Sequence, residues 1–373
     1  LYEISSHQYI IPGFTDLHNH APQWPQLGKS LDVPLEVWLQ KYTFPLEAKY
    51  NDEEFAKIVY SDLVASLLEA GTTTAVYYGT IHQKANRILA DTCLNLGQRA
   101  IIGKVVMDNP DECPEYYRDA STDAALTGTS EFMSYVKSND KNNDKRVDVA
   151  ITPRFIPSCT DEVLYELGRL AKRHSVYVQT HCSESDWEHN YVINRCGKSD
   201  TEALMEYGLL NRSTILAHAN FISETDMDLI KNEGAGIAHC PLSNFFFSDA
   251  VFPLRRALEK GLRVGLGTDI AGGPSVSIFD VGKTAIISAR ALENGVNPNT
   301  SREKRGCYDS RIDFADAFYL ATKGGADVLN ISAGSFEKEN YFDALLIDTE
   351  IDNAKISIQN GVEQDEDIIQ KMV

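Results

Sequence analysis

Residues Ile10-Ile11-Pro12-Gly13-Phe14-Thr15-Asp16-Leu17-His18-Asn19-His20 form an apolar run that leads into two histidines one position apart. The run is typical of a buried strand, and alternate side chains of a strand point to the same side. We therefore expect His18 and His20 to converge on one point. A single buried histidine is most simply a packed core residue, but a pair at a strand end also suits a metal ion such as zinc. Further ligands at equivalent places along the chain would decide between these interpretations.

The composition indicates a large buried core and a strongly acidic surface. The chain has 373 residues, 43% hydrophobic and 24% charged, with a net charge of -19. Nucleic acids and anionic membrane surfaces bind patches of Lys and Arg, so this charge argues against both as partners and favours a small neutral or cationic substrate. No apolar run approaches the roughly 18 residues that a membrane-spanning helix needs.

The seven cysteines are scattered along the chain and include no CxxC pair. This pattern argues against a disulfide scaffold and predicts free thiols in a reducing cytoplasm.

Strand and helix patterns alternate along the rest of the chain. After the first strand we expect strands at residues 72–78, 100–106, 147–152, 176–181, 214–218, 235–239 and 263–269. Helices are expected at 52–70, 83–96, 121–136, 160–174, 201–207, 224–232 and 250–260, with two more at 278–292 and 313–321. This α/β alternation predicts a (β/α)8 TIM barrel. An open doubly wound sheet is the alternative, but no Gly-rich dinucleotide-binding turn opens the first helix.

The two ends of the chain have no place in the barrel. Residues 1–4 and 343–348 are predicted as strands, and the acidic stretch 363–367 as a solvated turn or the start of a helix. We expect a barrel domain over residues 10–330, with residues 1–9 and 331–373 as pieces of a small β-sandwich domain that is incomplete at both ends. The connection 24–51 is interrupted by prolines and is expected to be either a cover over the site or a packed surface excursion.

Polar residues at the carboxyl ends of the strands are the candidate site, because active sites of such barrels lie there. They are His18, His20, Arg154, His181, His218, His239 and Asp269. Imidazoles with one carboxylate suit zinc, with iron as the second choice. Glu184 follows His181 by three positions; it is either a surface charge or the carboxylate that transfers protons beside a metal ion.

These motifs resemble the amidohydrolase superfamily and, within it, the zinc-dependent guanine deaminases. The matching segments are residues 12–23, 41–45, 152–155, 181–184, 239–244 and 265–273, and the likeness runs from about Ser5 to Asp348. The segments Lys41-Tyr42-Thr43-Phe44-Pro45 and Thr152-Pro153-Arg154-Phe155, together with Gln23, are the most specific; the histidine pair and Asp269 mark only the superfamily.

The resemblance implies one zinc ion per chain, bound by His18, His20, His181 and Asp269. One metal rather than two is implied because Arg154 follows the fourth strand, where two-metal relatives carry a carboxylated lysine. The implied catalytic residues are Glu184, Asp269 and His218, the last orienting the reacting water. The implied substrate-binding residues are His20, Gln23, Arg154, Phe155, His181, Glu184 and Asp269.

The implied reaction is hydrolysis of guanine to xanthine and ammonia, in purine catabolism or salvage, by a cytoplasmic homodimer. Two alternatives stay open at this stage. One is a deaminase or chlorohydrolase of a related heterocycle such as 8-oxoguanine, and the other is a non-catalytic barrel scaffold.

Overall fold

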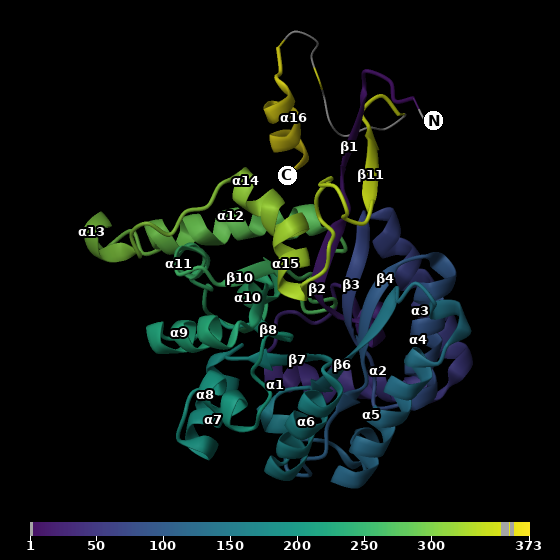
Figure 1. Cartoon of the computed structure of the whole chain (residues 1–373). Helices are drawn as coiled ribbons and strands as arrows, with labels where there is room; N and C mark the ends of the chain where they lie inside the picture. The colour runs from purple at the N-terminus through teal and green to yellow at the C-terminus, as the bar shows by residue number, and fades with distance from the viewer. Residues whose placement is uncertain (1–2, 352–357, 359–361) are drawn as a thin grey trace.

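The computed structural model describes residues 3–351, 358 and 362–373 (Figure 1). Parallel strands form the centre of the molecule, and each is hydrogen-bonded to the next one along the chain. They are β2 (Phe14–His20), β3 (Thr72–Tyr78), β4 (Arg99–Gly103), β6 (Val147–Pro153), β7 (Tyr177–Cys182), β8 (Thr214–His218), β9 (Gly236–His239) and β10 (Arg263–Leu266). A short strand, β5 (Val105–Val106), continues β4 and pairs with β6. The expected strand at 100–106 is therefore divided, with Lys104 between its parts in a buried ion pair with Asp119.

The barrel closes where the turn after β10 meets β2. The backbone N–H of Thr268 donates to Asp16 Oδ1 at 3.0 Å, and its hydroxyl donates to Asp16 Oδ2 at 2.6 Å. The N–H of Asp269 donates to the carbonyl oxygen of His18 at 2.8 Å. The predicted (β/α)8 barrel is confirmed, and its closure brings two candidate ligands together.

Helices cover the outside of the barrel (Figure 1). They are α3 (Glu53–Glu69), α4 (Gln83–Leu96), α5 (Thr122–Lys137), α6 (Asp161–His174), α8 (Asp200–Glu206), α9 (Glu224–Glu233), α11 (Leu254–Glu259), α12 (Ile278–Asn294), α14 (Phe314–Tyr319) and α15 (Gly325–Leu329). Their ends follow local signals: Asp52 caps α3 through the N–H groups of Glu54 and Phe55, and Gly97 ends α4 at φ 85°. Ile58 of α3 is 71% exposed, because the buried face of this helix is centred on Ala56 and Leu63.

Helices α7 (Asp186–Cys196), after β7, and α10 (Pro241–Phe247), after β9, were not predicted. Local signals exist for both helices: the Ser185 side chain caps α7, and Pro241 occupies the first turn of α10. Helix α11 begins later than expected, at Leu254 directly after Pro253. The expected helix 313–321 continues instead through a π-helical turn (η7, Leu320–Gly324) into α15, and a further short helix, α13, spans Arg302–Arg305.

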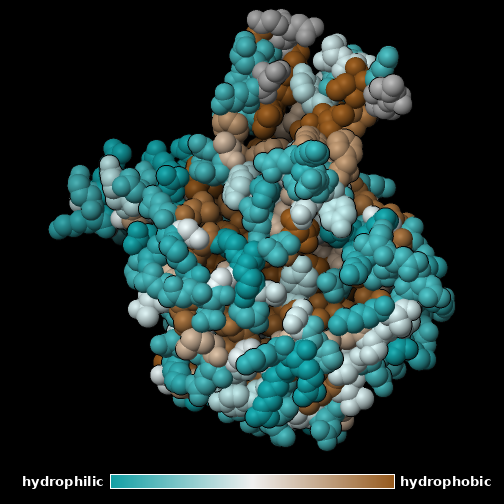
Figure 2. All heavy atoms as spheres, viewed as in Figure 1, coloured by the Kyte–Doolittle hydropathy of each residue, from teal (hydrophilic) through white to brown (hydrophobic). Residues whose placement is uncertain are grey.

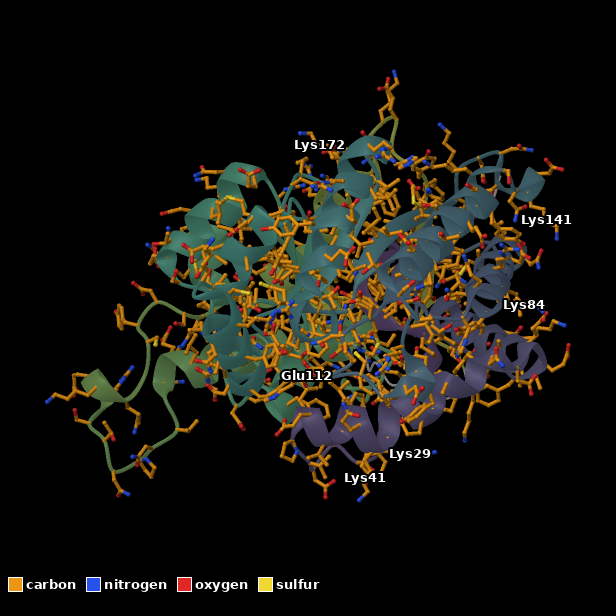
Figure 3. The ribbon with its side chains drawn as sticks, turned by 90° about the horizontal axis from the view of Figure 1, so that it is seen from below. Lys29, Lys41, Lys84, Glu112, Lys141 and Lys172 are labelled. Carbon is orange, nitrogen blue, oxygen red and sulfur yellow. The ribbon has the colours of Figure 1, made fainter. Side chains whose placement is uncertain are left out.

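Residues 21–51, here called the cover segment, form a series of short helical turns. They are η1 (Ala21–Gln26), α1 (Leu35–Trp38), η2 (Leu39–Thr43), α2 (Phe44–Glu47) and η3 (Ala48–Asn51). Apolar side chains such as Trp38 and Phe44 are buried against the barrel. Lys29 and Lys41 are exposed and lie on the outer edge of this segment (Figure 3). Lys41 of the motif at 41–45 therefore points away from the barrel.

A two-stranded antiparallel sheet lies outside the barrel (Figure 1). Strand β1 (Gln8–Pro12) pairs with β11 (Ala344–Asp348), so the strand expected at 343–348 is confirmed. The strand expected at 1–4 is wrong for Glu3 and Ile4, which are not in a strand. Leu1 and Tyr2 lie outside the described residues. Hydrophobic atoms gather around this sheet (Figure 2), and Ile10 and Leu346 are exposed there.

The run at 10–20 was expected to be one strand, but it divides at Gly13. The N–H of Gly13 donates to the Asp343 carbonyl at 2.9 Å, and a Cβ at this position would lie 2.2 Å from Thr73 Oγ1. Helix α16 (Asp365–Met372) starts within the acidic stretch at 363–367, as one of its two interpretations predicted. Among the described residues, no helix combines the length and the apolar character needed to cross a membrane.

Candidate active site

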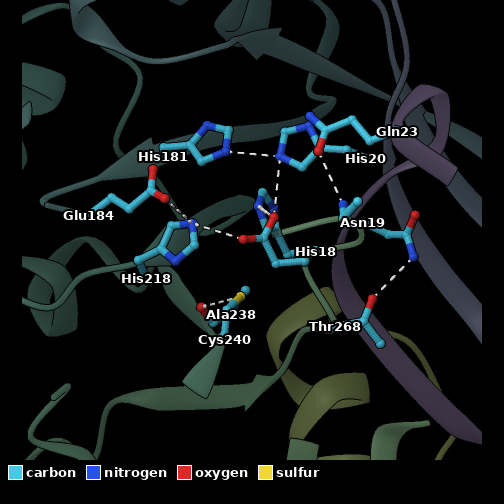
Figure 4. A network of polar contacts seen from close by, with 12 residues as sticks. His18, Asn19, His20, Gln23, His181, Glu184, His218, Ala238, Cys240 and Thr268 are labelled. Carbon is cyan, nitrogen blue, oxygen red and sulfur yellow. Dashed lines mark hydrogen bonds and ion pairs between the residues drawn. The ribbon is translucent and has the colours of Figure 1, made fainter. Parts of the chain in front are cut away.

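Three of the four predicted metal ligands, His18, His20 and His181, meet at the carboxyl end of the barrel (Figure 4), and Asp269 lies against them. His18 Nε2 lies 3.1 Å and His20 Nε2 3.4 Å from Asp269 Oδ1. His20 Nε2 and His181 Nε2 are 3.0 Å apart. All four side chains are buried. Because β2, β7 and the turn after β10 supply them, the site depends on barrel closure.

The donor set fits a metal ion. His181 Nδ1 is 2.5 Å from the Arg154 carbonyl oxygen, which can only accept a hydrogen bond, so Nδ1 carries the proton and Nε2 presents a lone pair to the cluster. His18 Nε2 is buried and has no hydrogen-bond partner. Burial, and next the neighbouring histidines, lower the pKa values of His18, His20 and His181 well below the usual range. Neutral imidazoles facing a carboxylate oxygen are the ligands that zinc prefers.

His218 faces the same cluster from the end of β8, where its φ is 70°. Asn220 Nδ2 donates to the Glu184 carbonyl oxygen, which fixes the orientation of the Asn220 amide. Asn220 Oδ1 therefore accepts from Asn244 Nδ2 at 2.7 Å. Asn244 Oδ1 is then an acceptor for His218 Nδ1 at 2.9 Å. His218 Nε2 consequently presents a lone pair to the site, 3.7 Å from Glu184 Oε1 and 3.8 Å from Asp269 Oδ2.

Glu184 is buried on the loop between β7 and α7. Its N–H donates to Glu188 Oε2 at 3.0 Å, and the N–H of Ser183, at φ 47°, donates to Asp200 Oδ1 at 3.0 Å. Burial raises the pKa of Glu184 well above its usual range, the negative charge of Asp269 adds to this, and Arg154 opposes it. These hydrogen bonds hold the backbone of Glu184 beside the cluster, and burial increases the proton affinity of its carboxyl group. The interpretation of Glu184 as a surface charge is wrong.

A narrow cavity adjoins this cluster. All seven residues predicted to bind substrate line it: His20, Gln23, Arg154, Phe155, His181, Glu184 and Asp269. Leu35, Trp38 and Leu39 of the cover segment, Ser243 and Phe247 of α10, and Gly272 complete the lining. The cover segment therefore closes over the cavity, as the first of its two interpretations predicted.

Arg154 is 2% exposed and forms a two-pronged ion pair with Glu47, which is also buried. Phe155 lies beside it, with its ring centroid 6.1 Å from that of His181. Gln23 Nε2 donates to Glu47 Oε1 at 2.9 Å, and Gln23 Oε1 accepts from the N–H of Ala271 at 3.1 Å. Sequence reasoning missed Glu47, although it follows the motif 41–45 by two positions. It also missed Asn220 and the individual role of Asn244.

His239 and His82 do not belong to the possible metal-ligand groups. His239 is buried at the end of β9 with its ring 5.2 Å from that of Phe252, and burial lowers its pKa to about 3. His82 precedes α4 and packs against Tyr117. In the described part of the chain, the possible metal-ligand groups draw only on His18, His20, His181, Glu184, His218 and Asp269.

A closed parallel barrel with buried histidines, an aspartate and a glutamate gathered at the carboxyl ends of its strands defines a class of barrel enzymes that work around a metal-ligating centre. The model of the amidohydrolase family matches residues 9–373, and the chain belongs to that family. The superfamily resemblance drawn from the motifs is thereby confirmed.

Similar relatives are guanine deaminases. The chain is 37% identical to guanine deaminase of Mus musculus over 96% of its own length and 77% of that protein. It is also 37% identical to guanine deaminase of Dictyostelium discoideum, over 98% and 78%. A solved structure of guanine deaminase from C. acetobutylicum, with guanine bound in its active site, superposes with a TM-score of 0.82 and 34% identity over 91% of this chain and 78% of that one.

Proposed function

We propose that this protein catalyses the hydrolytic deamination of guanine to xanthine and ammonia in purine catabolism or salvage. The observation that carries this proposal is the cavity in which Gln23, Arg154 and Phe155 face the histidine and aspartate cluster beside Glu184. Similarity to guanine deaminases over almost the whole chain supports it.

We assign one zinc ion per chain to His18, His20, His181 and Asp269. The lone pair of His181 Nε2 and the unpartnered His18 Nε2 support this set. Bound there, zinc would act as a Lewis acid that lowers the pKa of a water to about 7.

The residues of the chain move the protons. His218 Nε2 orients the attacking water by accepting one of its two hydrogens, and Asp269 Oδ2 lies 3.8 Å from this nitrogen. Glu184 accepts one water proton as the new C2–O bond forms and transfers it to ring N3. It then takes the proton of the new hydroxyl group and delivers it to the amine, so that the C2–N bond breaks, ammonia leaves and C2 becomes a carbonyl carbon. A raised carboxyl pKa suits a group that alternately accepts and donates protons.

Arg154 and Gln23 distinguish guanine from adenine. Both are anchored by Glu47 and offer N–H groups to the cavity. A ring carbonyl accepts from such donors, whereas the amino group of adenine leaves them unpaired.

The test is ammonia release and xanthine formation by the purified protein, measured together with its zinc content. Guanine is compared with 8-oxoguanine, adenine, cytosine and S-adenosylhomocysteine. We expect the highest kcat/KM for guanine and about one zinc per chain. A higher kcat/KM for another heterocycle would reassign the substrate, and a metal-free protein without turnover would indicate a scaffold.

We further propose that the protein is a cytoplasmic homodimer. Free cysteines in the described chain support a reducing compartment. Light scattering coupled to size-exclusion chromatography tests the assembly, and fractionation of cells tests the location.

A further inference from the structure

We propose that Glu47 is the residue that sets specificity for the 6-oxo group of the purine, by fixing Gln23 and Arg154 as hydrogen-bond donors. Glu47 does not line the cavity, so it acts through these two residues as a positioning residue. This role rests on the proposed function, because it concerns how the same cavity recognises its substrate.

Both oxygens of Glu47 are used inside the protein. Oε2 accepts from Arg154 Nη1 at 2.8 Å and from the Tyr117 hydroxyl at 2.6 Å. Oε1 accepts from Arg154 Nη2 at 3.1 Å and from Gln23 Nε2 at 2.9 Å. Glu47 is 0% exposed, so water does not compete for these contacts.

The charge of Glu47 determines the charge of the ligand that the cavity accepts. A buried guanidinium is strongly unfavourable unless a carboxylate pairs with it. Glu47 supplies that partner at 2.8 Å, with both charged groups buried. Glu47 thus balances the positive charge of Arg154 from outside the cavity, and the substrate does not need a negative charge of its own. This suits an uncharged base rather than a nucleotide phosphate.

The contacts also determine which group of each residue faces the ligand. Gln23 Oε1 accepts from the N–H of Ala271, and Gln23 Nε2 donates one hydrogen to Glu47. The second Nε2 hydrogen is therefore available to a ligand. Arg154 has only donors, and two of its N–H groups are directed to Glu47. Gln23 and Arg154 therefore both face the cavity as donors. Their complement is a ring carbonyl with a neighbouring ring nitrogen, as at O6 and N7 of guanine.

Glu47 also belongs to the cover segment, which supplies Leu35, Trp38 and Leu39 to the roof of the cavity. The Arg154 guanidinium lies 5.1 Å from the ring centroid of Phe44, in the same short helix as Glu47. The segment that closes the cavity is consequently the one that orients its donors.

The test compares wild-type protein with Glu47→Gln, which keeps the shape and removes the charge. Two purines serve as probes in direct binding measurements on the zinc-loaded protein. Hypoxanthine has the 6-oxo group but no amine to lose, and 2-aminopurine has the amine but no 6-oxo group. The exposed Glu69→Gln on α3 is the matched control.

We expect Glu47→Gln to raise the Kd of hypoxanthine roughly tenfold or more, as expected when buried donors lose their alignment. The Kd of 2-aminopurine should change by less than about threefold. With guanine as the substrate, Glu47→Gln should mainly raise KM, and the zinc content should stay unchanged. Glu69→Gln should behave as wild type.

Equal losses for both probes, or no loss for either, would overturn the role of Glu47. Selective loss of hypoxanthine binding in a protein that releases no ammonia from guanine would support Glu47 and overturn the proposed reaction alone. If Glu47→Gln does not fold, Tyr117→Phe removes one donor to Glu47 and keeps its charge. A smaller loss confined to hypoxanthine then supports the role, and equal losses contradict it.

Discussion

Asp16 and Thr268 join the first and last strands of the barrel directly beside the metal-ligand cluster. Asp16 accepts the N–H and the hydroxyl of Thr268, and also the N–H of His18 and the amide of Asn19. Burial raises the pKa of Asp16 to about 6, although all four hydrogen bonds act to lower it. This carboxylate connects the strand that carries His18 to the turn that carries Asp269.

We expect Asp16→Ala to lower the free energy of unfolding by about 3 kcal/mol or more, because it leaves several buried donors without an acceptor. Zinc affinity should fall as well, since His18 and Asp269 lose their common anchor. Thr268→Val, which replaces the hydroxyl group by a methyl group, should lower the free energy of unfolding by about 1–2 kcal/mol. Urea unfolding and metal titration measure both effects; an Asp16→Ala protein of wild-type stability would contradict this view of barrel closure.

His18→Ala and His20→Ala should each lower bound zinc and guanine turnover together, because each removes an imidazole from a cluster with Asp269. His174 is exposed at the end of α6 and supplies the control, His174→Ala, which should keep both properties. Metal analysis beside steady-state kinetics is the measurement. Normal metal content and activity in both cluster variants would remove these residues from the ligand set.

Glu184→Gln should retain zinc but lose roughly a hundredfold or more in kcat, the usual scale for a positioned acid–base group. The amide fits the same space, and the loop contacts to Glu188 and Asp200 involve backbone N–H groups that the substitution leaves in place. If the variant loses its metal instead, Glu184 is a ligand and not the group that transfers protons.

Asn244→Leu should reduce kcat by roughly 10–100-fold, the range observed for residues that orient groups in metal sites. The reason is that Asn244 Oδ1 is the acceptor that keeps the proton of His218 on Nδ1. Zinc content should stay unchanged, because His218 is not among the four assigned ligands. A variant with normal kcat would mean that the tautomer of His218 does not depend on Asn244.

The sequence predicted the features that depend on local patterns. Strands such as 72–78 and 214–218 and the pair His18 and His20 can be recognised from the spacing of their own residues, so the barrel order followed from the sequence. The choice of ligands rested on the resemblance to the amidohydrolase superfamily. Glu47 and Arg154 are 107 positions apart, and nothing near either residue indicates the other. Their contact exists only because the cover segment folds back over the barrel. The division of the first strand at Gly13 likewise depends on a distant partner, Asp343.

Arg154→Lys should reduce kcat/KM for guanine by roughly tenfold or more, about 1.4 kcal/mol or above. Lysine can pair with Glu47 as a point charge, but it cannot bind both carboxylate oxygens with one planar group as Arg154 does at 2.8 and 3.1 Å. It also cannot direct a further fixed N–H group towards a ring carbonyl. Zinc content should be unchanged, because the contact of Arg154 with His181 is made by its backbone carbonyl oxygen. Steady-state kinetics and metal analysis on the same preparation separate these effects. Wild-type kinetics in Arg154→Lys would place recognition of the purine on Gln23 and Phe155 alone.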